Sequence, residues 1–122
     1  MVIGLQCVVL DCPVPGELAQ FYQALLGGDV DRPDPRWTLT DDWSTLHTGA
    51  GWVLAFQRVD DYRPPRWPDP VHPKQFHLDI GVEDLDEAQK LALEAGAALL
   101  RDEGGWRVFA DPVGHPFCLV RE

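Results

Sequence analysis

The side chains with the widest chemical range in this sequence are its four histidines and three cysteines. His77 stands in the segment "QFHLDIGV", in which polar and apolar residues alternate. Alternation is typical of a strand and places Gln75, His77 and Asp79 on one face, opposite an apolar stripe. An imidazole on such a face suits proton transfer near neutral pH, so His77 is a candidate general base. The equal alternative is a structural His77, hydrogen-bonded to Asp79 or Gln75.

The three cysteines form no Cys-x-x-Cys pair and are odd in number. They therefore predict neither a disulfide framework nor a zinc ribbon, and they fit a reducing compartment. Cys118 lies in the closing segment "DPVGHPFCLV", on the same predicted strand face as Val120. It can face the same cavity as His77, although a cysteine in a strand most often serves as a small buried hydrophobe.

Two similar halves, about 70 residues apart, position these residues. Each half begins with a strand, residues 3–10 or 75–82, followed by an amphipathic helix that ends at glycine. Three strand candidates follow each helix: "RWTLT", "STLHT" and "WVLAFQRV" in the first half, and "AALLRD", "WRVFA" and "PFCLV" in the second. The stretch between the halves contains five prolines, which favour an extended, stiff connector.

Composition and charge exclude several classes of protein. The chain has 122 residues, 45% hydrophobic and 25% charged, which predicts one globular domain. Its formal charge of -10 repels nucleic-acid phosphates and anionic membranes, so we expect neither as a partner. No apolar run reaches a membrane-spanning length and the first residues lack the features of a signal peptide, which predicts a cytoplasmic protein.

The sequence resembles the vicinal-oxygen-chelate superfamily of glyoxalases, bleomycin-resistance proteins and extradiol dioxygenases, and within it the glyoxalase-like domains. The segments that carry the resemblance are "VVLDCPVPGELAQFYQALLG", "QFHLDIGVEDLDEAQKLALEAGA" and "FADPVGHPFCLV". The resemblance implies an α+β fold of two βαβββ modules that form a cupped mixed sheet, with helices outside and a ligand cavity in the cup. The single domain 1–122 would then consist of module 1–60, a proline-rich linker 61–74 and module 75–122.

Metal-dependent members of this superfamily place ligands in the first and last strands of each module. The resemblance puts these positions on Cys7 or its neighbour Gln6, on Ala55 with Gln57 as the nearest polar residue on its face, on His77, and on Cys118. Both carboxylate positions are therefore vacant. Since Mg, Mn, Ni and Fe sites use imidazole and carboxylate ligands, we expect no cofactor.

A divalent metal remains possible with other donors. Cys7, His77 and Cys118 would suit zinc and leave its fourth position open. Alternatively, His77 with Gln57 and Cys118 or Glu122 would form the rearranged site of a metal-dependent lyase, isomerase or dioxygenase.

The resemblance and the vacant positions together predict a protein that binds a small organic molecule in the cavity without the usual metal. The expected cavity residues are Cys7, Gln57, Trp67, Gln75, His77, Asp79 and Cys118. A further alternative is an antibiotic-sequestering protein of the bleomycin-binding type, because a cationic drug would match the net charge. Whether the protein is an enzyme is left open. Because relatives often pair, we expect a homodimer.

The remaining histidines and the tryptophans have simpler interpretations. We expect His47, His72 and His115 to be exposed in turns or the linker. Asp111 begins a turn and should have a geometric role. Most of the five tryptophans, Trp37, Trp43, Trp52, Trp67 and Trp106, should pack in the core or an interface. In the alternative, Trp37, Trp43 or Trp67 lines the cup and stacks on a planar ligand.

Overall fold

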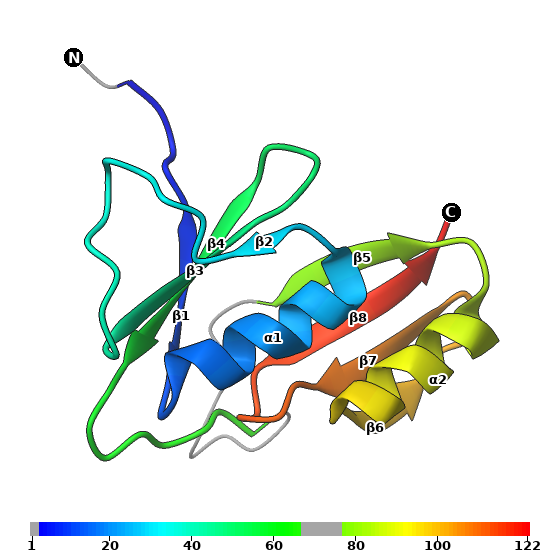
Figure 1. Cartoon of the computed structure of the whole chain (residues 1–122). Helices are drawn as coiled ribbons and strands as arrows, with labels where there is room; N and C mark the ends of the chain where they lie inside the picture. Colours follow the sequence, from blue (N-terminus) through cyan, green and yellow to red (C-terminus); the bar gives the residue numbers. More distant parts are fainter. Residues whose placement is uncertain (1–2, 67–76) are drawn as a thin grey trace. The chain divides into compact units, whose positions relative to one another are not determined.

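The two halves of the sequence fold as two compact units. The structure is a computed structural model that describes residues 3–66 and 77–122 (Figure 1). The units are Met1–Tyr62 and Arg63–Glu122, and the element orders are β1-α1-β2-β3-β4 and β5-α2-β6-β7-β8. The predicted α+β fold with two βαβββ modules is confirmed. The cupped arrangement of the two sheets stays a prediction, and most of the predicted linker 61–74 lies outside the described residues.

Unit 1 contains one mixed sheet and one helix. Its elements are β1 Val8–Cys12, α1 Pro15–Leu26, β2 Asp29–Val30, β3 Trp43–His47 and β4 Val53–Arg58. The strand order is β1-β4-β3-β2, in which β1 runs parallel to β4 and the other pairs are antiparallel.

The core of unit 1 is formed by one face of α1 and one face of the sheet. Pro15 begins the helix, at a position where its missing N–H costs no hydrogen bond, and Gly27 ends it. Tyr22 of α1 is fully buried and stacks on Phe56 of β4, with 5.9 Å between the ring centroids. Successive side chains of a strand point to opposite faces, so the other face of the sheet is left for Trp43, Thr45 and His47 of β3.

Two strand predictions in unit 1 are wrong in position. The first strand was expected at residues 3–10 but begins at Val8 and includes Cys12, because Pro13 ends it. The segment "RWTLT", residues 36–40, is no strand apart from a single bridge between Thr40 and Trp43. The second strand of the module is instead β2, directly after the helix.

Glycine makes this early β2 possible. Gly28 has φ +89°, and a Cβ there would lie 2.2 Å from the His47 carbonyl oxygen. Only glycine allows so close an approach of two backbones. Asp29 then pairs with His47 at the end of β3, which fixes where the intervening loop must begin.

Unit 2 repeats the topology with a different core. Its elements are β5 Leu78–Val82, α2 Leu85–Ala95, β6 Ala98–Asp102, β7 Trp106–Ala110 and β8 Pro116–Arg121, in the sheet order β5-β8-β7-β6. Strand β5 is parallel to β8, and the other pairs are antiparallel. Phe109 and Phe117 are fully buried and stacked, with centroids 5.4 Å apart.

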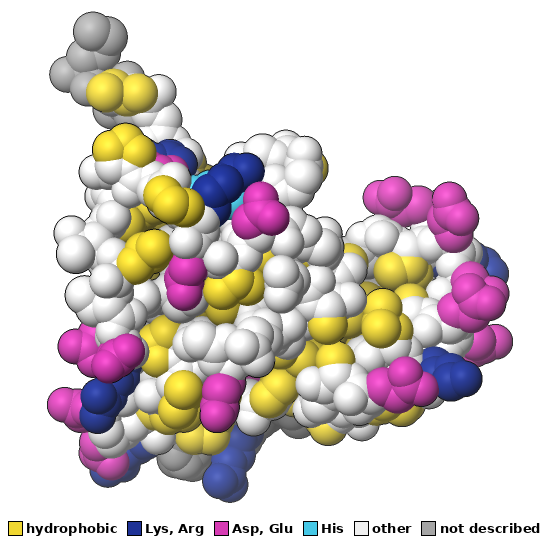
Figure 2. Space-filling view, viewed as in Figure 1, with side chains coloured by type: hydrophobic (Ala, Val, Ile, Leu, Met, Phe, Trp, Pro, Cys, Tyr) yellow, Lys and Arg dark blue, Asp and Glu magenta, His cyan; other side chains and the backbone are white. Residues whose placement is uncertain are grey.

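Helix α2 is more exposed than α1. The Asp84 side chain caps it by accepting hydrogen bonds from the backbone N–H groups of Asp86 and Glu87. Only Leu85 and Ala92 of the helix are buried. Figure 2 shows acidic side chains over this region, with hydrophobic ones between them. Neither described helix, of 12 and 11 residues, is long and apolar enough to cross a membrane.

Candidate ligand and metal site

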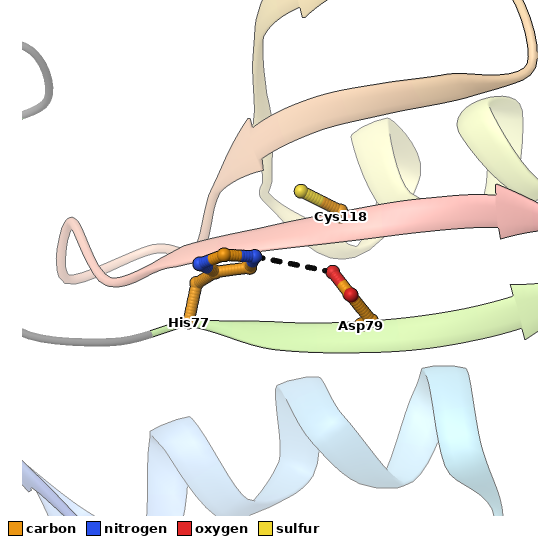
Figure 3. A group of neighbouring side chains, drawn as sticks. All are labelled: His77, Asp79 and Cys118. Atoms are coloured by element: carbon orange, nitrogen blue, oxygen red, sulfur yellow. Dashed lines mark ion pairs between the residues drawn. The ribbon is translucent and has the colours of Figure 1, made fainter.

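Strands β5 and β8 of unit 2 bring together His77, Asp79 and Cys118. Asp79 lies directly opposite Cys118 in the parallel pairing of these strands, and His77 precedes β5 on the same side of the chain as Asp79. Figure 3 shows the three side chains pointing to the same side of the two strands. One potential ligand atom from each lies within 4.8 Å of the other two.

The three side chains differ in exposure. His77 Nε2 is 3.2 Å from Asp79 Oδ1, and these side chains are 34% and 65% exposed. Cys118 is 2% exposed. A carboxylate that bonds one ring nitrogen fixes the orientation and tautomer of the imidazole. The site therefore consists of an oriented, solvent-accessible His–Asp pair beside a buried thiol.

The Glu122 side chain lies over the face of β5 that carries His77 and Asp79. A Cβ at Gly81 would lie 2.6 Å from the Glu122 carboxyl group, so this side chain occupies the space that a residue-81 side chain would take. Because residues 77, 79 and 81 alternate with the apolar stripe, this is also the face of His77 and Asp79. Glu122 is nevertheless not part of the group within 4.8 Å.

The positions of unit 1 that correspond to Asp79 and Cys118 carry no donor atoms. Val9 lies opposite Ala55 in the β1–β4 pairing, as Asp79 lies opposite Cys118 in the β5–β8 pairing. Ala55 offers no ligand atom, and its own side chain is fully buried.

The other predicted cavity residues are not brought into the group. Cys7 is half-buried and Gln57 is exposed, and both belong to unit 1, whereas the group of three belongs to unit 2. Burial raises the pKa of the Cys7 thiol, and the nearby Arg36 guanidinium opposes that rise. Trp67 and Gln75 lie outside the described residues.

The donor set of unit 2 does not fit a hard divalent ion. Ions such as Mg and Mn take carboxylate, carbonyl and water oxygens in octahedral sites, and the group offers one carboxylate, one imidazole and one buried thiol. The same set fits zinc, which accepts Cys sulfur at about 2.3 Å and His nitrogen or carboxylate oxygen at about 2.0–2.2 Å. Three such ligands would leave the fourth zinc position open.

Asp79 is the potential ligand that reasoning from the sequence missed. It was expected to line the cavity or to pair with His77, and the pairing is observed. Its place among the potential ligands follows from the register that sets it beside Cys118. The alternation in "QFHLDIGV" already placed it on the face of His77, so the signal was present.

The expectation for His47 is wrong. His47 is 4% exposed and lies in β3, where its Nε2 is 3.1 Å from Asp34 Oδ2. The loop between β2 and β3 supplies Asp34, whose carboxylate is also bound by the Arg36 guanidinium at 2.7 Å. Hydrogen bonds from the Arg36 side chain, from its backbone N–H and from His47 hold the pKa of Asp34 well below its usual range. No periodic pattern in the loop predicted this contact.

The remaining turn and aromatic predictions have mixed outcomes. Asp111 has the expected geometric role, because it accepts hydrogen bonds from the backbone N–H groups of Val113 and His115. His115 is half-buried rather than exposed, and His72 is outside the described residues. None of the four described tryptophans is buried in the core: Trp37 and Trp43 are half-buried, whereas Trp52 and Trp106 are exposed.

Comparisons with known proteins agree with this architecture. A family model described as a glyoxalase-like domain matches residues 7–120. The fold with paired modules is that of the vicinal-oxygen-chelate superfamily, and the chain belongs to its glyoxalase-like domain family. Among curated proteins, none matches the chain.

Three solved structures illustrate the similarity. A hypothetical protein from S. aureus is 21% identical with TM-score 0.69, and the match covers 100% of both chains. A glyoxalase/bleomycin resistance protein/dioxygenase family enzyme from Burkholderia phytofirmans is 16% identical with TM-score 0.72, covering 95% of this chain and 96% of the other. A mutant of the fosfomycin resistance protein FosX from Listeria monocytogenes, complexed with Mn(II) and a dihydroxypropylphosphonic acid, is 16% identical with TM-score 0.68, covering 98% and 93%. At these identities the similarity shows the fold alone.

Proposed function

We propose that this protein binds a small organic molecule on the sheet face that carries His77, Asp79 and Cys118, without a hard divalent ion. The observation that carries the proposal is the His77–Asp79 pair, 3.2 Å apart, beside a thiol at the position where the resemblance implies a metal-binding glutamate. The imidazole and carboxylate are accessible, so both can exchange water for a polar ligand.

The chemistry of the pair suits recognition of a hydrogen-bonding group and transfer of a proton. Asp79 orients the ring, and an imidazole is a side chain that can transfer a proton near neutral pH. The buried thiol contributes a soft, weakly polar surface beside the pair. If the protein is an enzyme, His77 is the residue that would take the proton.

NMR spectra of chelator-treated protein test this proposal. The measured quantity is the chemical shift of a ring proton of His77 and of the carbon to which it is bonded. The probes are fosfomycin, catechol and bleomycin, added one at a time. We expect at least one probe to shift the His77 signal and leave that of His115 unchanged, because His115 lies in the 111–115 turn, outside the cluster. Asp79→Asn should weaken the response by about fivefold or more, since the ring loses its charged partner.

A second candidate function is a zinc-dependent member of the family. The three potential ligands within 4.8 Å favour it, because they are donors that zinc accepts. In the same NMR experiment, no response without metal and a probe response only after zinc is added would replace the metal-free proposal with this one. No response under either condition would reject both.

We also propose a homodimer in a reducing compartment. Exposed hydrophobic side chains of unit 2 support an interface, namely Leu91, Leu93, Leu99, Leu100 and Trp106. The cysteines are free thiols, as reducing conditions would keep them. Sedimentation equilibrium tests the dimer, and a single species of 13.7 kDa would contradict it.

A further inference from the structure

Unit 2 contains a cavity on the side of its sheet that faces helix α2. The cavity has a volume of about 340 Å³, and its lining includes five charged residues, namely Glu83, Asp84, Asp86, Arg107 and Arg121. This volume lies within the range of small-molecule sites, roughly 300–1,000 Å³. The charged lining indicates a polar occupant rather than an apolar one.

The cavity is separate from the site proposed above. Arg121 of β8 pairs with Val82 of β5, three residues after Asp79 and therefore on the opposite face of the sheet. Arg107 of β7 points to the helix side as well, because its guanidinium donates to the Leu85 carbonyl of α2 at 3.2 Å. The cavity therefore lies at the first turn of α2, on the sheet face opposite the one that carries Asp79.

Three of the five charged side chains already have partners within unit 2. Asp84 caps α2 by accepting hydrogen bonds from the backbone N–H groups of Asp86 and Glu87. The Arg107 guanidinium donates to Asp86 Oδ1 and to Gln89 Oε1, each at 2.9 Å. The Arg107 side chain is 14% exposed, so these bonds hold it as a fixed part of the cavity wall.

Glu83 and Arg121 are the two charges of the lining that remain. Among the residues that the structure describes, neither side chain takes part in a hydrogen bond or an ion pair, and both are exposed. The backbone brings them near each other, because Glu83 follows Val82, the residue opposite Arg121. One cavity thus presents an unpaired carboxylate and an unpaired guanidinium to solvent.

The balance of charge decides between classes of occupant. Three carboxylates and two guanidiniums line the cavity, which disfavours a simple anion such as phosphate. A simple cation would pair with Glu83 and leave Arg121 without a partner. A molecule that carries one negative and one positive group complements both unpaired residues at once.

We propose that this cavity binds a small zwitterion, an amino acid or a short peptide, with its carboxylate on Arg121 and its ammonium group on Glu83. A guanidinium binds a carboxylate through two parallel hydrogen bonds, which fixes the orientation of the molecule. The inference goes beyond the proposed function, because the cavity lies on the other face of the sheet and uses neither His77 nor Cys118.

NMR titration with three zwitterions tests the proposal. Glycine, 4-aminobutyrate and glycylglycine differ in the separation of their charges, and the backbone N–H signal of Gly104 in the cavity lining reports binding. We expect at least one of them to bind. Its N-acetylated derivative lacks the positive charge and its carboxamide lacks the negative charge, so each should bind about tenfold or more weakly. His77→Ala should leave the binding unchanged, which separates this result from the proposed function.

Two variants that each remove one charge assign the contacts. Arg121→Gln should weaken the zwitterion about tenfold or more and leave binding of the carboxamide unchanged. Glu83→Gln should weaken the zwitterion by a similar factor and leave binding of the N-acetylated derivative unchanged. Because both positions are exposed, the variants should fold as the wild type does.

Two matched controls remove the same charges outside the cavity lining. Arg101 of β6 already pairs with Glu103 at 2.6 Å, and Glu94 lies in the last turn of α2. Arg101→Gln and Glu94→Gln should therefore leave binding unchanged.

Three results would overturn the proposal. The first is that none of the three zwitterions shifts the Gly104 signal. The second is a singly charged derivative that binds as tightly as its zwitterion, because the cavity would then accept an anion or a cation alone. The third is an equal loss of binding in the control variants, which would show that net charge and not the cavity determines the affinity.

Discussion

Both units contain a histidine whose Nε2 bonds an aspartate, at 3.1 Å in unit 1 and 3.2 Å in unit 2. The His47 side chain is 4% exposed, whereas that of His77 is 34% exposed. The same pair of residue types therefore serves two roles. His47 fastens a loop to the sheet, while His77 is held in place and remains accessible to a ligand.

The origin of the aspartate explains the difference. Asp34 comes from the long loop before β3, so its bond to His47 brings that loop over the strand face. Asp79 stands two residues after His77 on the same side of β5, so their contact requires no covering segment. The buried His–Asp pair of unit 1 therefore depends on a contact between residues far apart in the sequence. The exposed His–Asp pair of unit 2 forms between residues of one strand segment.

The largest expected difference is in stability. His47→Ala should lower the free energy of unfolding by about 2 kcal/mol or more, because it removes a buried side chain and frees the loop. His77→Ala should change it by less than about 0.5 kcal/mol, as is usual for accessible positions. Urea denaturation of the two variants measures both values. Equal losses would show that the two pairs do not differ in role.

The next difference is in pH dependence. The folded-state pKa of Asp34 is depressed, so its carboxylate stabilises the fold above the unfolded-state value of about 3.9 and loses this contribution as the pH falls below it. Asp34→Asn should therefore lower the unfolding temperature at pH 7, with a gap to the wild type that narrows in acid. Asp79→Asn is the matched control with a smaller expected effect. A gap for Asp34→Asn that stays constant from pH 7 to pH 2 would contradict the assignment.

A smaller effect concerns the thiols of the two units. Cys7 is half-buried, while Cys12 and Cys118 are buried, so a thiol reagent such as iodoacetamide should modify Cys7 first. Because burial raises its pKa, the reaction should be slow at pH 7 and accelerate above pH 9, where the stabilisation from the buried neutral thiol is lost. Mass spectrometry of the native protein measures the order. Modification of Cys118 before Cys7 would contradict the burial difference.

Much of the fold could be predicted from the sequence, because its signals are local. Alternation in "LDIGV" and the helical spacing of Leu18 and Tyr22 gave the correct element types, and glycine gave the correct helix ends. Strand β2 could not be predicted this way, because it has only two residues and depends on the close approach of Gly28 to β3.

The two sites differ in the same respect. The unit 2 cluster was largely predictable, because His77 and Asp79 are two residues apart on one strand and Cys118 lies on the strand beside it. The burial of His47 was not, because its cause is Asp34, thirteen residues away in a loop with no periodic pattern. Local periodicity predicts which face a side chain occupies, and only the tertiary fold determines what covers that face.

The central claim is that unit 2 retains an oriented histidine without a hard-ion site. The most direct test is the metal content, after desalting, of wild-type protein and His77→Ala purified without chelator. We predict no stoichiometric Mn, Fe or Ni in either protein, because the group around His77 supplies one carboxylate and a buried thiol. Stoichiometric Mn, Fe or Ni in the wild type that is lost in His77→Ala would contradict the account.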